Sequence, residues 1–328
     1  MFSDQPIIGH ERQRAELLHD IVSGTLTHAY LFSGKKHIGK FTMARWFAER
    51  ILTHSCNNDR EKESQSLLVH RNTHPDLLTL DTLWIDETCT DWNVIGRSSS
   101  APQQHRAKAK AKTDTIGIDD VRALQERLYE TPQGTHTICL IRSIERLHIT
   151  AANALLKILE EPPSRVLFCF TTESLSSLPA TIISRMRVIN FSPLPRSILE
   201  PLVSALPAED RELLLGIAQG APGIIIRCLG DAERLRAEKQ AGIDAYRFLQ
   251  NPSLLERFRE MLTVMEEEES SVLFLRQIFL KLSKNLHGSA SEAEKAAHFA
   301  RHFFSILSIL QSNAHRPLLA AHASLSST

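Results

Sequence analysis

The sequence predicts an α/β domain built on a mostly parallel sheet, followed by helical domains that extend to residue 328. Three short apolar runs, typical of strands covered on both faces, alternate with helix-like stretches over about the first 190 residues: 29–32, 137–141 and 166–170. No strand pattern follows the Pro-Leu-Pro segment at 193–195. We therefore expect an α/β domain over 1–192, a small helical domain over 193–240 and an all-α C-terminal domain over 241–328.

Apolar residues at helical spacing predict the helices of the first and last domains. The clearest faces are Met43, Trp46, Phe47 and Ile51; Val121, Leu124 and Leu128; and those within 270–286 and 293–310. A further helix is expected over 151–161, with Thr150 as its N-cap and Pro162 as its stop.

Composition narrows the function classes. Lys and Arg together number 38, as do Asp and Glu, so the chain lacks the basic excess expected of a protein that binds DNA strongly by itself. We expect any contact with nucleic acid to be shared with partners. No apolar run reaches the length of a membrane span, and residues 1–9 lack a signal-peptide pattern, so a cytoplasmic protein is expected. The five scattered cysteines suit reduced thiols better than disulfides.

Residues 84–114 interrupt the α/β rhythm. They hold few apolar side chains and include an alternating Ala-Lys run over 107–112, which predicts a flexible surface insertion. Two interpretations stay open for its lysines: a solvated loop, or a basic patch that touches DNA phosphates.

A phosphate-binding loop is predicted at residues 34–40, between a strand and a helix. Gly34, Gly39 and Lys40 have the G-x-x-x-x-G-K spacing, in which glycines turn backbone N–H groups toward phosphates and the lysine adds a charge. The next position, which should carry a hydroxyl for Mg²⁺, is Phe41, and Thr42 is rotated by ~100° around the helix. The loop therefore either binds a nucleotide without turnover or stays empty.

The acidic pair of a P-loop ATPase is also missing. Such enzymes place acids at the end of a neighbouring strand to hold Mg²⁺ and to polarise water. Here the strand 137–141 is followed by Arg142 and Ser143, and we assign Glu145 to the following helix. ATP hydrolysis by the isolated chain is not expected.

Longer motifs carry a family resemblance. The segments 151–163 (AANALLKILEEPP) and 178–186 (LPATIISRM), together with 7–10, 28–32, 74–77 and 313–318, resemble the AAA+ clamp-loader subunits of bacterial DNA polymerase III. The resemblance spans nearly the whole chain. In this family the motor subunits keep the P-loop hydroxyl and the acidic pair, whereas delta-prime-type subunits tolerate their loss. The resemblance thus implies an AAA+ domain, a helical lid and a helical collar of the delta-prime type.

The resemblance also implies the site residues. The family's Ser-Arg-Cys motif corresponds to Ser184, Arg185 and Met186, and Arg185 would be an arginine finger for the ATP site of an adjacent subunit. The alternative for Arg185 is a surface residue or a structural ion pair. The family's four-cysteine zinc module is not matched, because its region holds only Cys56 near His54, His70 and His74, so we expect no zinc and no other metal.

The resemblance, together with the missing metal-binding groups, implies a clamp-loader stator that braces ATP-driven loading of a sliding clamp onto primed DNA, within a DNA-directed DNA polymerase holoenzyme (a nucleotidyltransferase). The resemblance implies motor (gamma/tau) and delta subunits as partners in a hetero-oligomer, with clamp and DNA contacted through the complex. No cofactor is required, although ATP or ADP binding without hydrolysis stays open. Two alternatives remain: an active motor subunit of the same loader, and an AAA+-derived adaptor in another complex.

Overall fold

The computed structural model describes residues 7–56, 58–71, 73–80, 116–129, 131–251, 253–265, 268–285 and 301. The expected insertion at 84–114, the motif at 313–318 and, apart from residue 301, the expected helix at 293–310 lie outside the described residues. The chain divides into two compact units, Met1–Ile198 and Leu199–Thr328. Within the described residues, no helix is long and apolar enough to cross a membrane.

The first unit contains a five-stranded parallel sheet in the order β2-β3-β4-β1-β5. Its strands are β1 (Ala29–Gly34), β2 (Leu77–Leu80), β3 (Thr137–Ile141), β4 (Val166–Thr172) and β5 (Arg187–Phe191). The three predicted strands are confirmed as β1, β3 and β4, and they occupy the middle of the sheet. The structure adds the two edge strands, β2 and β5.

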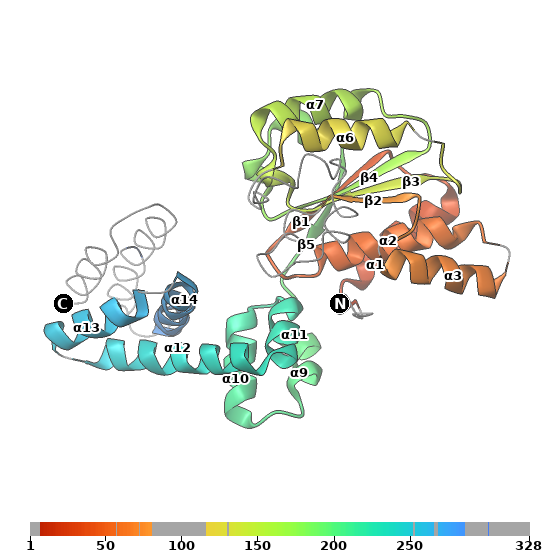
Figure 1. Cartoon of the computed structure of the whole chain (residues 1–328). Coiled ribbons are helices and arrows are strands. Elements are labelled where there is room, and N and C mark those ends of the chain that lie inside the picture. The colour runs from red at the N-terminus through yellow and green to blue at the C-terminus, as the bar shows by residue number, and fades with distance from the viewer. Residues whose placement is uncertain are drawn as a thin grey trace. The chain divides into compact units, whose positions relative to one another are not determined.

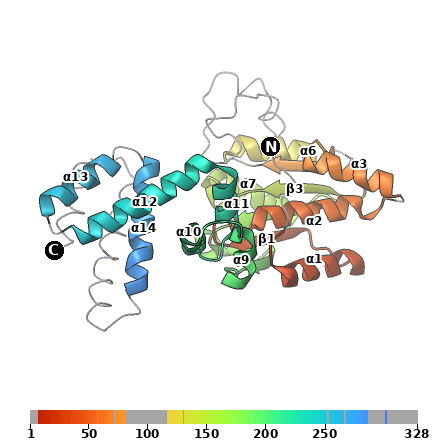
Figure 2. The ribbon, with the colours of Figure 1, turned by 90° about the horizontal axis from the view of Figure 1, so that it is seen from below.

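Helices cover both faces of this sheet (Figure 1). One face carries α1 (Glu11–Ser23), α2 (Lys40–His54) and α3 (Asp59–His70); the other carries α6 (Ile118–Leu128) and α7 (Ile149–Glu160). Figure 2 shows α1, α2 and α3 side by side, as their mutual contacts require. The short helix α8 (Ala180–Ile183) precedes β5, and two 3-10 turns, η2 (Ile144–Arg146) and η3 (Leu175–Ser177), follow β3 and β4.

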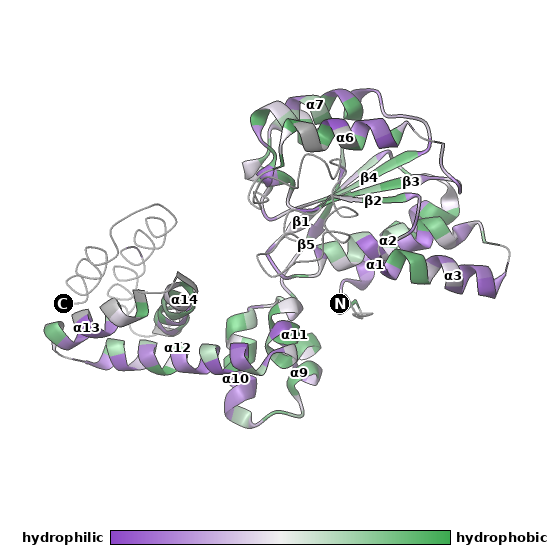
Figure 3. Ribbon diagram, in the orientation of Figure 1, coloured by the Kyte–Doolittle hydropathy of each residue, from purple (hydrophilic) through white to green (hydrophobic). Residues whose placement is uncertain are grey.

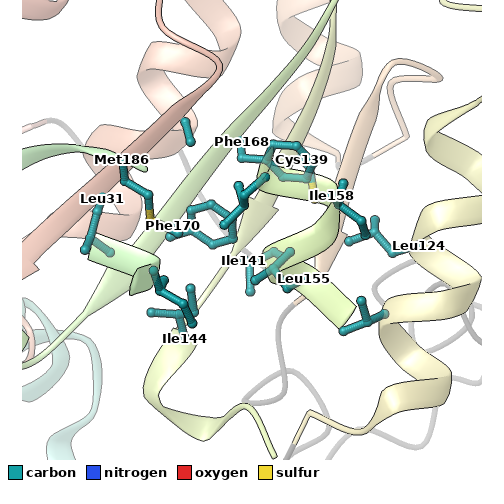
Figure 4. Close-up of a cluster of buried hydrophobic side chains, with 14 of the residues drawn as sticks. Leu31, Leu124, Cys139, Ile141, Ile144, Leu155, Ile158, Phe168, Phe170 and Met186 are labelled. Atoms are coloured by element: carbon teal, nitrogen blue, oxygen red, sulfur yellow. The ribbon is translucent and has the colours of Figure 1, made fainter. Parts of the chain in front are cut away.

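The strands supply side chains to two separate hydrophobic cores because successive residues point to opposite faces. In β1, Leu31 belongs to the core under α6 and α7, whereas Tyr30 and Phe32 belong to the core under α1 and α2. Figure 4 shows the first core, where Phe168 and Phe170 of β4 lie near side chains from α6 and α7. Burial on both faces explains why β3 and β4 are hydrophobic over most of their length in Figure 3.

The expected cap of α7 is wrong. Thr150 lies inside the first turn, and the N-cap is His148, which makes no side-chain cap hydrogen bond. The backbone N–H of His148 donates to the carbonyl of Ile116, beside a parallel bridge between Ile116 and Leu147. This tertiary contact holds residue 148 extended, so the helix begins at Ile149.

Helices alone make up the described part of the second unit, in agreement with the loss of strand patterns after residue 195. They are α9 (Arg196–Val203, which spans the division between the units), α10 (Ala208–Ala218), α11 (Pro222–Gly230), α12 (Ala232–Gln250), α13 (Leu254–Met265) and α14 (Glu268–Asn285). The α12 helix packs along α14, with Phe248 and Phe274 in edge-to-face contact. Because α12 continues through residue 240, the expected boundary between the second and third domains falls inside one helix, and the three-domain division stays a prediction.

Candidate nucleotide site and arginine finger

The predicted phosphate loop connects the carboxyl end of β1 to the start of α2, as its sequence context requires. Gly34, His37 and Gly39 all have positive φ, at 155°, 61° and 107°. A Cβ atom on Gly34 would lie 2.5 Å from the carbonyl oxygen of Phe191, so only glycine fits there. The first turn of α2 contains no acidic residue, which leaves the positive end of the helix dipole available to an anion.

Lys40 is buried beneath this loop, with 8% of its surface exposed. Its Nζ donates to the carbonyl oxygens of Gly34, at 2.5 Å, and Lys35, at 2.8 Å. Burial lowers the pKa of Lys40 to about 8, although the carboxylates of Glu173 and Glu145 oppose that shift. No described carboxylate lies within ion-pair distance of the amine. The loop therefore holds a cation whose charge a bound phosphate would stabilise.

The two residues that replace the metal-binding groups contact one another. The guanidinium carbon of Arg142, just after β3, lies 5.3 Å from the ring centroid of Phe41 in α2, within the range of a cation–π interaction. A guanidinium and an aromatic ring thus occupy the side where a P-loop ATPase holds Mg²⁺ with a hydroxyl and a carboxylate. Neither of these two side chains offers Mg²⁺ an oxygen ligand.

The residues that follow Arg142 are held by β4. Ser143 has a left-handed backbone conformation (φ 54°), and its N–H donates to Oγ1 of Thr171 over 3.0 Å. Glu145 lies in the 3-10 turn η2 before α7, which corrects its assignment to the longer helix. Its Oε1 accepts a 3.3 Å hydrogen bond from the N–H of Glu173, and its Oε2 is buried without a hydrogen-bond partner. No other carboxylate takes the place of the missing acidic pair within 142–145.

The predicted finger lies at the amino ends of the parallel strands, whereas the phosphate loop lies at their carboxyl ends. Arg185 follows α8 and precedes β5, where Arg187 pairs with Tyr30, whereas Gly34 of the phosphate loop pairs with Phe191. Strands β1 and β5 are parallel and rise ~3.3 Å per residue. The four steps from Tyr30 to Gly34 therefore separate the two ends of the strands by about 13 Å. The structure therefore does not bring Arg185 together with Lys40 of its own chain.

Arg185 is held by two hydrogen bonds from different nitrogens. One terminal nitrogen donates to Oε1 of Glu160 and the other to the carbonyl oxygen of Thr181, each over 2.7 Å. The Oγ of Ser184 also donates to the Thr181 carbonyl, at 3.1 Å, and Met186 is buried in the core under α6 and α7. The ion pair that sequence analysis kept as an alternative thus exists, and it leaves the Arg185 side chain a third exposed (33%).

The candidate metal ligands near Cys56 are not gathered into a site. No group of three or more His, Cys, Asp or Glu side chains among the described residues is placed to hold a metal. His70 lies 3.6 Å from a carboxylate oxygen of Glu49, and Nδ1 of His74 accepts from the N–H of Asp76. These two histidines have local partners in the fold.

Sequence analysis missed the role of Asp76 in the 74–77 motif. Its buried carboxylate accepts hydrogen bonds from the N–H groups of Gln133, at 2.8 Å, and Gly134, at 2.7 Å. The motif therefore fixes the turn that leads into β3. An acid directly before a strand did not reveal a partner 57 residues away in the sequence.

Comparisons with known proteins match mainly the first unit of the chain. A family model described as "DNA polymerase III, delta subunit" matches residues 9–195. The DNA polymerase III subunit tau of Bacillus subtilis is 26% identical over 188 residues, which are 57% of this chain and 28% of that protein. Subunit tau of Escherichia coli is 28% identical over 189 residues, 55% of this chain and 24% of that protein. The chain therefore spans less than a third of the length of these relatives.

A solved structure shares the fold over a longer range. The DNA polymerase III gamma subunit-related protein of Thermotoga maritima is 17% identical, with a TM-score of 0.53 over 94% of this chain and 99% of that chain. Since the family model covers more than half of the 328 residues, the chain belongs to the DNA polymerase III, delta subunit family.

Proposed function

We propose that this chain is a delta-prime-type stator of the bacterial DNA polymerase III clamp loader. In this role an AAA+ domain, a helical lid and a helical collar brace the motor (gamma/tau) and delta subunits. The loader then uses ATP to place a sliding clamp on primed DNA. The observation that carries the proposal is the contact between Phe41 and Arg142, because it replaces the metal side of the nucleotide site while the phosphate loop keeps its geometry.

Arg185 is the proposed contribution of this chain to ATP hydrolysis. Arg185 lies at the amino ends of the strands, opposite the phosphate loop, which supports action on a neighbouring subunit rather than on its own site. A guanidinium suits this role because it stays charged and can bridge phosphate oxygens. Ser184 helps to shape the turn that carries it, through its hydrogen bond to Thr181.

The test is reconstitution of the loader from the motor subunits, the delta subunit and the full chain carrying Arg185→Ala. Because arginine fingers accelerate phosphoryl transfer by several orders of magnitude, we expect the DNA- and clamp-stimulated ATPase to fall by at least about tenfold. Arg165→Ala, which removes an exposed arginine from the turn before β4, is the control. Undiminished ATPase with Arg185→Ala would sink the finger assignment.

Two further measurements separate the alternatives. The purified chain alone should show no ATPase, whereas an active motor subunit would hydrolyse ATP without partners. Co-purification with the motor and delta subunits is expected of a stator, and its failure would favour an adaptor in another complex.

Nucleotide binding is tested by titration calorimetry with ADP. If the loop binds a nucleotide, the affinity should not depend on Mg²⁺, because Phe41 and Arg142 offer the ion no ligand. Lys40→Ala should abolish the binding. A heat of ADP binding that appears only when Mg²⁺ is present would contradict this account of the site.

A further inference from the structure

We propose that Glu160 is a positioning residue for Arg185, which holds the guanidinium in place for the phosphate of a neighbouring subunit. This inference rests on the proposed function of Arg185 as a finger in trans. Glu160 itself would touch neither nucleotide nor water, and would act only through the arginine.

The geometry fixes the guanidinium at two points. Glu160 is the last residue of α7 and Thr181 lies in α8, so the two acceptors belong to different elements. Each accepts from a different terminal nitrogen of Arg185 over 2.7 Å, which sets both the position and the plane of the group. A guanidinium has five N–H donors, and no further described residue bonds this one, so the remaining donors can meet phosphate oxygens without release from Glu160.

The place of Glu160 is not explained by the stability of its own helix. It ends α7, where the unpaired carbonyls make the helix terminus partly negative and a carboxylate is unfavourable. Its side chain is also half exposed (51%), and exposed ion pairs add little to fold stability. Removal of this carboxylate should therefore leave the fold intact while it frees a long, flexible arginine side chain.

Glu161 supplies a matched control. It follows Glu160 directly and is exposed, and its side chain has no partner among the described residues. A variant at Glu161 therefore removes the same charge from the same helix end without loss of a contact to Arg185.

The experiment uses the reconstituted loader with the full chain carrying Glu160→Ala, Glu160→Gln, Glu161→Ala, Arg185→Ala or the double change at 160 and 185. Since a misplaced catalytic group can cost up to a hundredfold in rate, we expect Glu160→Ala to lower the kcat of the stimulated ATPase by about tenfold. The KM for ATP should stay unchanged. Glu160→Gln keeps an acceptor oxygen and should lose less, and Glu161→Ala should match the unmodified loader.

The double variant separates positioning from a merely structural role. In the Arg185→Ala background, Glu160→Ala should have no additional effect, and the thermal midpoint of the chain should not move. A Glu160→Ala loader with unchanged or raised ATPase, while Arg185→Ala is impaired, would overturn the inference; a raised value would mean that the carboxylate competes with phosphate. If Arg185→Ala has no effect, the proposed role of Arg185 as a finger in trans fails, and the inference about Glu160 fails with it.

Discussion

Replacement of Lys40 by methionine removes a positive charge that the fold buries without a paired anion. Burial lowers the pKa of this amine from its ordinary 10.5 to about 8. The folded state therefore holds the proton less tightly than the unfolded chain does. The buried charge therefore lowers the free energy of unfolding. This destabilisation is fully present below pH ~8. It is lost as the pH rises toward the ordinary pKa, because the unfolded chain then binds the proton more than the folded one does.

The magnitude follows from the same values. One pKa unit corresponds to about 1.4 kcal/mol, so the charge on Lys40 costs about 3 kcal/mol at neutral pH. Methionine recovers this cost but loses the two hydrogen bonds to the carbonyls of Gly34 and Lys35, at about 1 kcal/mol each. We expect Lys40→Met to stabilise the chain by about 1 kcal/mol at pH ~7. By pH ~9.5 about 2 kcal/mol of the destabilisation by the Lys40 charge has gone. Lys40→Met should then be less stable than the unmodified chain by about 1 kcal/mol.

Urea unfolding followed by circular dichroism at the two pH values measures this change of sign. Lys36→Met removes an exposed lysine whose charge is the smallest contribution to the lowered pKa of Lys40, so it should change the free energy of unfolding much less at either pH. The reasoning is refuted if Lys40→Met is less stable at neutral pH and the difference does not vary with pH. Confirmation would mean that the loop keeps a destabilising charge, a feature typical of sites prepared for a ligand.

Three further predictions concern stability and use the same unfolding assay. Gly34→Ala should destabilise by about 2–4 kcal/mol, because its Cβ would lie 2.5 Å from the Phe191 carbonyl oxygen at a φ of 155°; a loss below about 1 kcal/mol would contradict the close approach of β1 and β5. Gly216→Ala, inside α10 with nothing within 4 Å of the added atom, should stabilise by about 0.5–1 kcal/mol, and a net loss would be unexpected. Asp76→Ala should cost about 2–4 kcal/mol, since two N–H groups at 133–134 lose a carboxylate partner, and Asp76→Asn should recover part of this.

Local sequence patterns predicted the middle of the sheet and not its edges. The strands β1, β3 and β4 are covered on both faces, so each appears as a continuous apolar run. The two strands that were missed, β2 and β5, are the edges of the sheet. The first has only four residues, and the second buries only Ile189 and Phe191, so neither contains such a run. Edge strands carry a weaker signal because less of their surface is covered.

The sequence by itself determined the residues of the candidate phosphate loop and of its missing metal side. The spacing of Gly34, Gly39 and Lys40 depends on local backbone geometry, and the loss of metal ligands depends only on which residues stand at 41 and 142. Only the tertiary structure decided how these groups meet. Phe41 contacts Arg142, and Arg185 bonds Glu160 at the opposite ends of the strands from its own phosphate loop. These contacts depend on the strand order, which brings together segments that local periodicity cannot relate.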